Sequence, residues 1–148
     1  MLRRTILGCV VMFVVILALG GCVTTTTLEL TVTITSIKTP VERSNEVIYD
    51  FCKILIANPG EESYRAYYEW IELNSQGEVV WSGVGRDEYY LYPGYREELS
   101  LNALFPPDDY EAGLYTLVIR LITPGPDGVV GTNDDVVLAE DRKSFELK

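Results

Sequence analysis

The chain of 148 residues contains no histidine. This excludes nucleophile pairs and general bases that depend on an imidazole, and it removes the commonest metal ligand. Cysteine is also scarce, because two of the three, Cys9 and Cys22, fall in the first 22 residues. Cys52 is alone in the remainder, so neither a disulfide nor a thiolate zinc site can form there. It lies in an apolar run, and we interpret it as a small core residue rather than a reactive thiol.

Basic residues are few, with 12 Lys and Arg against 22 Asp and Glu. A chain this acidic is not expected to bind nucleic acid or to lie on an anionic membrane, because both need clusters of Lys and Arg. An acidic surface attracts cations and basic partners instead. Acidic pairs adjacent in sequence point to opposite faces of a strand, so we interpret them as solubility charge and do not expect an enzyme. These pairs are Glu61/Glu62, Glu97/Glu98, Asp108/Asp109 and Asp134/Asp135.

The amino terminus has the form of an export signal: Arg3 and Arg4 precede an uncharged run over residues 6–19. The run is shorter than the roughly 20 apolar residues of a membrane-spanning helix. It ends in Leu-Gly-Gly-Cys at residues 19–22, which resembles the lipobox of bacterial lipoproteins. The resemblance implies cleavage before Cys22 and lipid attachment to that cysteine. The alternative is an uncleaved signal anchor in which Cys22 has no role.

The predicted organisation is therefore a signal peptide over 1–21, the lipidated Cys22 with a Thr-rich tether over 22–27, and one domain over 28–148. Cleavage leaves ten basic and 22 acidic residues, a net charge of −12. The resemblance places the domain in the cell envelope, outside the cytoplasm. Val23 after the cysteine favours the outer membrane where the cell has one.

Apolar and polar residues alternate with period 2 through most of the domain, and no stretch outside the signal has a helical period. Turn signals such as Asn-Pro-Gly at 58–60 separate the runs. The pattern predicts an all-β protein with an antiparallel sandwich of seven to eight strands. The predicted strands are 28–35, 47–57, 64–73, 78–82, 87–92, 98–104, 115–122, and an interrupted strand formed by 136–139 and 144–147.

Two features resemble the immunoglobulin fold. Trp70 lies in the third predicted strand, where such sandwiches place a core tryptophan, and Glu111 to Tyr115 resembles the tyrosine corner that enters strand F of such sandwiches, here the predicted strand 115–122. Tyr92-Pro93-Gly94 and the segment 77–81 resemble CARDB adhesion-type modules and the BsuPI-type proteinase-inhibitor domain. The fold implied is an immunoglobulin-like or fibronectin-like sandwich.

The segment 125–135 is rich in Gly and Asp and resembles calcium loops of bacterial surface proteins. Asp127, Asn133, Asp134 and Asp135 are the candidate calcium ligands, since calcium takes six to eight oxygen ligands. In an immunoglobulin topology Glu61 and Glu62 would lie at the same end and could complete the shell. The alternative is a solvated hairpin loop in which these residues serve turn geometry.

Tyr92 and Tyr95 are candidate contacts for a partner, together with Glu61 and Glu62, because exposed tyrosine is favoured in loop-based binding sites. The alternative is that the tyrosines pack in the core or along strand edges, which we favour for Tyr68 and Tyr115. The function expected is a lipid-anchored binding, adhesion-type or accessory module that presents its loops to a protein or glycan. The alternative is a BsuPI-like inhibitor whose loop at 105–110 or 124–135 blocks a protease.

Overall fold

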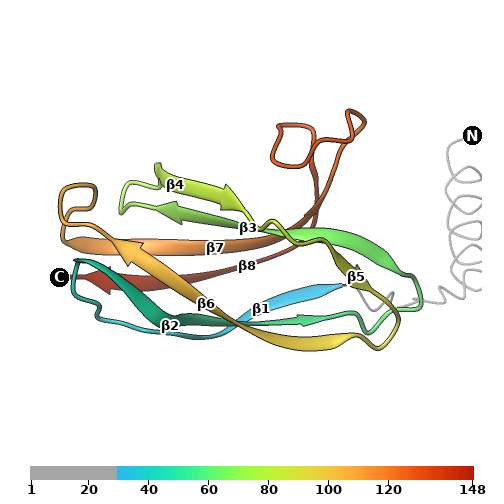
Figure 1. The fold of residues 1–148 in the computed structure, drawn as a ribbon, viewed down its shortest axis with the longest axis horizontal. Coiled ribbons are helices and arrows are strands. Elements are labelled where there is room, and N and C mark those ends of the chain that lie inside the picture. Colours follow the sequence, from blue (N-terminus) through green and yellow to red (C-terminus); the bar gives the residue numbers. More distant parts are fainter. Residues whose placement is uncertain (1–29) are drawn as a thin grey trace, which may run out of the picture.

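The computed structural model describes residues 30–148, and in this part of the chain every regular element is a β-strand. The all-β prediction is confirmed: eight strands form two antiparallel sheets that pack face to face (Figure 1). One sheet has the order β1-β2-β6, and the other has β4-β3-β7-β8 with β5 paired to the start of β3. The strands are β1 (Thr31–Ile37), β2 (Ser44–Ala57), β3 (Tyr64–Leu73), β4 (Val79–Val84), β5 (Tyr89–Leu91), β6 (Arg96–Phe105), β7 (Gly113–Thr123) and β8 (Val136–Leu147).

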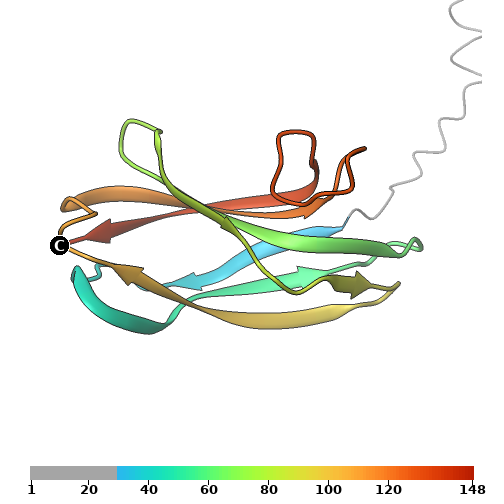
Figure 2. The ribbon, with the colours of Figure 1, turned by 45° about the horizontal axis from the view of Figure 1, so that its top comes forward.

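The two sheets lie one over the other (Figure 2). Alternation along the strands turns one apolar side of each sheet toward the other. Phe51 of β2 is fully buried and contacts the rings of Phe105 and Phe145 edge-to-face, with centroids 5.1 Å away in each case. Trp70 is 7% exposed, and Cys52 is buried beside this aromatic cluster, so both are core residues as predicted.

The tyrosine corner is also present. The side chain of Tyr115 is 6% exposed, and its hydroxyl donates a 3.0 Å hydrogen bond to the carbonyl oxygen of Glu111. This bond ties the segment before β7 to the strand itself, as the sequence resemblance implies.

The predicted strands match the structure closely, and the largest correction concerns the last of them. Residues 136–147 form a single strand, β8, instead of two pieces. The polar residues in its middle find partners at the edge of the sheet: Arg120 of β7 lies 2.6 Å from a carboxylate oxygen of Glu140, and Oδ2 of Asp141 accepts a 2.7 Å hydrogen bond from the N–H of Ile34. A register shift opposite Leu121 and Ile122 takes up one extra residue, which is a β-bulge.

Residues 1–29 lie outside the described part of the chain, and so do the predicted signal, Cys22 and the tether. Among the described residues the first strand begins at Thr31, and it runs on to Ile37, beyond the predicted end at residue 35. Within residues 30–148 there is no helix long and apolar enough to cross a membrane.

Candidate binding groove between two sheet edges

The inward face of the β3–β4 hairpin sets aromatic side chains opposite glycines. In the register of the two strands, Trp70 is paired with Gly83 and Glu72 with Trp81. The carbonyl oxygen of Tyr68, next along the same face of β3, accepts a hydrogen bond from the N–H of Gly85. Directly opposed side chains in antiparallel strands normally pack on one another. Here two of the three opposed positions carry no side chain.

The rings occupy the room that the glycines leave. A Cβ added at Gly83 would lie 2.6 Å from Cη2 of Trp81, and one at Gly85 would meet the ring of Tyr68. The Trp81 and Trp70 rings meet edge-to-face with centroids 6.4 Å apart. Trp81 is 48% exposed, so a large aromatic surface at this edge of the sheet remains open to solvent.

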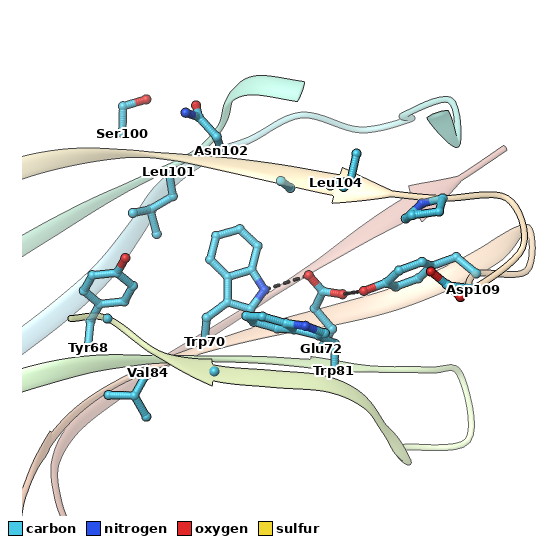
Figure 3. Close-up of a pocket in the computed structure, with 15 residues that line it drawn as sticks. Tyr68, Trp70, Glu72, Trp81, Val84, Ser100, Leu101, Asn102, Leu104 and Asp109 are labelled. Carbon is cyan, nitrogen blue, oxygen red and sulfur yellow. Dashed lines mark hydrogen bonds between the residues drawn. The ribbon is translucent and has the colours of Figure 1, made fainter. Parts of the chain in front are cut away.

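The second wall of the groove is β6, an edge strand of the other sheet (Figure 3). Leu101 points into the space, whereas Ser100 and Asn102 point away from it (Figure 3). The turn after β6, with Asp109 and Tyr110, lies at one end. The groove has a volume of about 650 Å³, which is within the range of ligand sites.

Glu72 lies inside the groove and is only 3% exposed. Its Oε1 accepts a 2.7 Å hydrogen bond from Nε1 of Trp70, and its Oε2 accepts one of 2.5 Å from the hydroxyl of Tyr110. Burial raises the pKa of Glu72, and the two hydrogen bonds oppose this because they stabilise the carboxylate. Burial and the hydrogen bond to Glu72 in turn raise the pKa of Tyr110.

The groove is acidic in character. Two carboxylates, Glu72 and Asp109, line it, and no Lys or Arg does. The ion pairs found within residues 30–148 involve Glu69, Glu88, Glu98 and Glu140, and not Glu72. Removing a carboxylate from water costs free energy that a nearby cation would offset. The groove therefore combines exposed indole surface with a buried acid that lacks a cationic partner in the described chain.

The predicted partner-binding residues lie elsewhere, at one end of the two sheets. The side chain of Asn58, which is fully buried, donates hydrogen bonds to the carbonyl oxygens of Glu62 and Leu91. Its own N–H donates to the carbonyl oxygen of Tyr95. The turn that carries Glu61 and Glu62 is thus joined through Asn58 to the turn that carries Tyr92 and Tyr95.

Of the two tyrosines, Tyr92 is 52% exposed and contacts the ring of Tyr95 edge-to-face. The hydroxyl of Tyr95 donates a hydrogen bond to Glu97. Glu61 and Glu62 are both exposed. These residues form a small surface patch without a described cavity, and their role in binding stays a prediction.

The loop over 124–135 is organised by its own carboxylates. Oδ2 of Asp135 accepts hydrogen bonds from the N–H groups of Gly131 (2.6 Å) and Thr132 (3.1 Å), and Oδ1 of Asp127 accepts one from Val129. The hydroxyl of Thr132 donates a hydrogen bond to Asp134 and thereby lowers the pKa of that carboxyl. Oδ1 of Asp135 is buried without a hydrogen-bond partner in the described chain.

No group of three or more His, Cys, Asp or Glu side chains that could hold a metal occurs within residues 30–148. The structure therefore does not place Glu61 and Glu62 with Asp134 and Asp135 in one acidic cluster. Calcium binding by Asp127, Asn133, Asp134 and Asp135 stays a prediction.

The groove itself was not predicted from the sequence, although two signals point to it. Period 2 in β3 puts the charged Glu72 on the same face as Trp70, where an apolar residue is expected. On β4 the same period puts Trp81 and Gly83 on one face, followed by Gly85. Glycine weakens a strand interior and often marks a close approach to it.

Comparison with known proteins gives no family for this chain. No protein-family model and no curated protein matches it. Similar solved structures include the alkylpurine DNA glycosylase AlkC from Pseudomonas fluorescens (13% identity, TM-score 0.48, 81% of this chain and 29% of that chain). Another is the putative ApaA protein from Bordetella pertussis (19% identity, TM-score 0.44), where the match covers 79% of this chain and 94% of that chain. A third is a β-glucosidase from Kluyveromyces marxianus (17% identity, TM-score 0.37), where it covers 81% of this chain and 15% of that chain. This chain spans less than a third of the glycosylase, and at these TM-scores the likenesses carry no argument about it.

Proposed function

We propose that this protein is a bacterial lipoprotein whose domain is held outside the cytoplasm by lipid on Cys22 and binds a partner through the groove between β4 and β6. The groove is the observation that carries the binding proposal, because Trp81 remains exposed in it beside the buried carboxylate of Glu72. An adhesion-type or accessory role in the envelope fits such a module.

The immunoglobulin-like identity of the domain belongs to this proposal. The strand orders β1-β2-β6 and β4-β3-β7-β8 correspond to A-B-E and C′-C-F-G of that fold. The corner at Tyr115 and the core position of Trp70 support the same assignment. One departure is β5, which pairs with β3 where the D strand of constant-type domains would join the first sheet.

The proposal is for a binding protein and not an enzyme. Both oxygens of Glu72 accept hydrogen bonds from neighbouring side chains, which suits a fixed charge better than a group that transfers protons. The other carboxylate of the groove, Asp109, lies in the turn after β6. Binding to aromatic surface with a few polar groups is the common pattern of ligand sites.

The anchor is tested by Cys22→Ser in the full-length chain expressed in a bacterial host. We expect the wild-type protein in the membrane fraction, soluble only with detergent, because several acyl chains anchor a protein almost permanently. The Cys22→Ser protein should lose lipid labelling by radioactive palmitate. Cys9→Ser, in the same apolar run, is the matched control and should be labelled normally. Unchanged labelling of Cys22→Ser would refute the lipoprotein assignment.

The inhibitor resemblance remains the alternative function. The loop over 105–110 is compact, since the N–H groups of Asp109 and Tyr110 both donate to the carbonyl oxygen of Pro106 and the Tyr110 side chain is 8% exposed. The loop over 124–135 is likewise closed by internal hydrogen bonds. Residual activity of a panel of serine proteases at excess full-length protein tests this alternative, and unchanged protease activity would dismiss it.

A further inference from the structure

We infer that the groove takes an extended basic segment of a protein partner, which adds to the free edge of β6 and places a Lys or Arg side chain against Trp81 and Trp70 beside Glu72. This inference rests on the proposed binding function and names the chemistry of the partner. Three separate features support it: the negative charge of the groove, its exposed aromatic surface, and the free strand edges beside it.

The negative charge of the groove favours a positively charged ligand. Glu72 is buried with no cationic partner among residues 30–148, and Asp109 adds a second acid to the lining. The same part of the chain holds 21 acidic and ten basic residues, so the surrounding surface also attracts positive charge. A neutral ligand would leave the carboxylate of Glu72 unpaired, whereas an ammonium or guanidinium group would offset its burial.

The aromatic surface suits the same group. A Lys or Arg head over the face of a tryptophan is attracted by the negative potential of the ring. Trp81 offers indole surface for such a contact because it is 48% exposed, with its ring lying against Gly83. The long aliphatic stem of Lys or Arg would cover the apolar lining, such as Leu101, on the way to Glu72.

The strand edges explain why an extended segment is expected and not a free small cation. In the described chain, β6 pairs only with β2, and β4 ends the other sheet. Each therefore has unpaired backbone N–H and C=O groups beside the groove, which is the arrangement that accepts an added strand. In an added strand alternate side chains point to the same face. One of them can therefore enter the groove while its neighbour stays in solvent.

The intrinsic tryptophan fluorescence of the chain can report binding in the groove. Its two tryptophans, Trp70 and Trp81, both line the groove, so intrinsic tryptophan emission reports this site alone. The full-length protein is kept in a non-ionic detergent without a sugar headgroup. It is titrated at low salt with a ten-residue peptide that alternates lysine and threonine. We expect saturable emission change with a Kd of about 1 mM or tighter and weaker binding as salt is raised.

Control probes test separately whether binding needs positive charge, an added strand, and a peptide in place of a free cation or a glycan. A peptide that alternates glutamate and threonine should not bind, because its charge has the wrong sign. A lysine peptide with proline at two central threonine positions should bind at least about tenfold more weakly, since proline cannot donate to an added strand. Tetramethylammonium chloride tests a free cation, and cellohexaose tests a neutral glycan.

Variants locate the binding. Trp81→Ala should weaken the lysine peptide about three- to thirtyfold, with Trp70 still reporting. Ser82→Ala, which lies between Trp81 and Gly83 and pairs with Ile71 on the other face of the same strand, is the matched control and should bind normally. Glu72→Gln keeps the size of the side chain and should weaken binding about tenfold or more.

Equal binding of the glutamate peptide, of the proline peptide or of tetramethylammonium would overturn the inference. So would binding that Trp81→Ala leaves unchanged. If cellohexaose changes the emission and the lysine peptide does not, the basic-strand inference fails while the proposed binding function stands. If no probe changes the tryptophan emission at concentrations up to 1 mM, the inference also fails. The lipid anchor is tested separately, by the labelling of Cys22→Ser.

Discussion

Glu72 is a charged residue on the core side of β3, and its position is held by one hydrogen bond from an indole and one from a phenol. Burial dominates these bonds and raises the pKa of its carboxyl above the ordinary value of 4.5. An acid whose pKa is higher in the folded than in the unfolded state favours folding most when it is protonated. Its contribution is therefore complete below about pH 4.5 and is lost as the pH rises through the folded pKa.

The variant Glu72→Gln should remove this dependence. Glutamine is neutral at all pH values, and its amide can still accept from Trp70 while its NH2 group turns to the oxygen of Tyr110. Relative to the variant, the wild-type protein should lose thermal stability as the pH is raised from 4 to 8. The loss in the free energy of unfolding amounts to about 1.4 kcal/mol for each tenfold difference between the acid dissociation constants of Glu72 in the folded and the unfolded state.

Melting temperatures of both full-length proteins across this pH range measure the difference. Glu46→Gln, at an exposed position of β2, is the control for the loss of one negative charge. A constant difference between wild type and Glu72→Gln at every pH would contradict the assigned direction of the pKa shift.

At the scale of the element, β4 is unusual because its inward face carries Gly83 next to the large ring of Trp81. Gly83→Val restores a β-branched side chain, which an edge strand tolerates well. The new Cβ would lie 2.6 Å from Cη2 of Trp81, so the indole ring must move out of the groove. We expect a red-shifted tryptophan emission and about tenfold weaker binding of the lysine peptide, with a melting temperature within a few degrees of wild type.

Ser82→Val is the matched control for Gly83→Val, since Ser82 is exposed on the other face of β4. It should leave emission and binding unchanged. A groove that binds the peptide normally with valine at position 83 would show that the open glycine face has no part in recognition.

The loop over 124–135 allows a direct test of the calcium prediction. Ligand binding to the folded state alone stabilises it by RT ln(1 + [L]/Kd), so a site of about 10 µM would add about 2.7 kcal/mol at 1 mM calcium. A calcium-dependent rise in the melting temperature that Asp135→Asn abolishes would support the site. Asp108→Asn, at an exposed turn position, is the control. An equal melting temperature in calcium and in chelator would leave the loop as a self-bonded hairpin.

At the scale of the whole molecule, the alternation of apolar and polar residues was enough to predict the layers. Every predicted strand has a counterpart, and the corner at Tyr115 forms the predicted bond. Period 2 and turn residues are local signals, and they fix which face of each strand is buried. The continuous β8 could not be predicted in the same way, because Arg120 and Glu140 meet only through strand pairing.

The groove could not be predicted from the sequence for a related reason. It is formed by β4 and β6, which belong to different sheets, and a cavity between them depends on how the sheets pack. The sequence shows Glu72, Gly83 and Gly85 as local exceptions to the strand pattern. Only the fold shows that these exceptions face the same space. Tyr92 and Tyr95, which were predicted to bind, lie on the turn before β6, away from that space.

The central claim is that recognition takes place in the groove and not at the end that carries Glu61, Glu62, Tyr92 and Tyr95. Hydrogen–deuterium exchange of the full-length protein, with and without the lysine–threonine peptide, tests this most directly. We predict new protection along β6 and β4, with the turns at 58–63 and 92–95 unchanged. Protection confined to those two turns, with β4 and β6 exchanging as in the free protein, would contradict the claim.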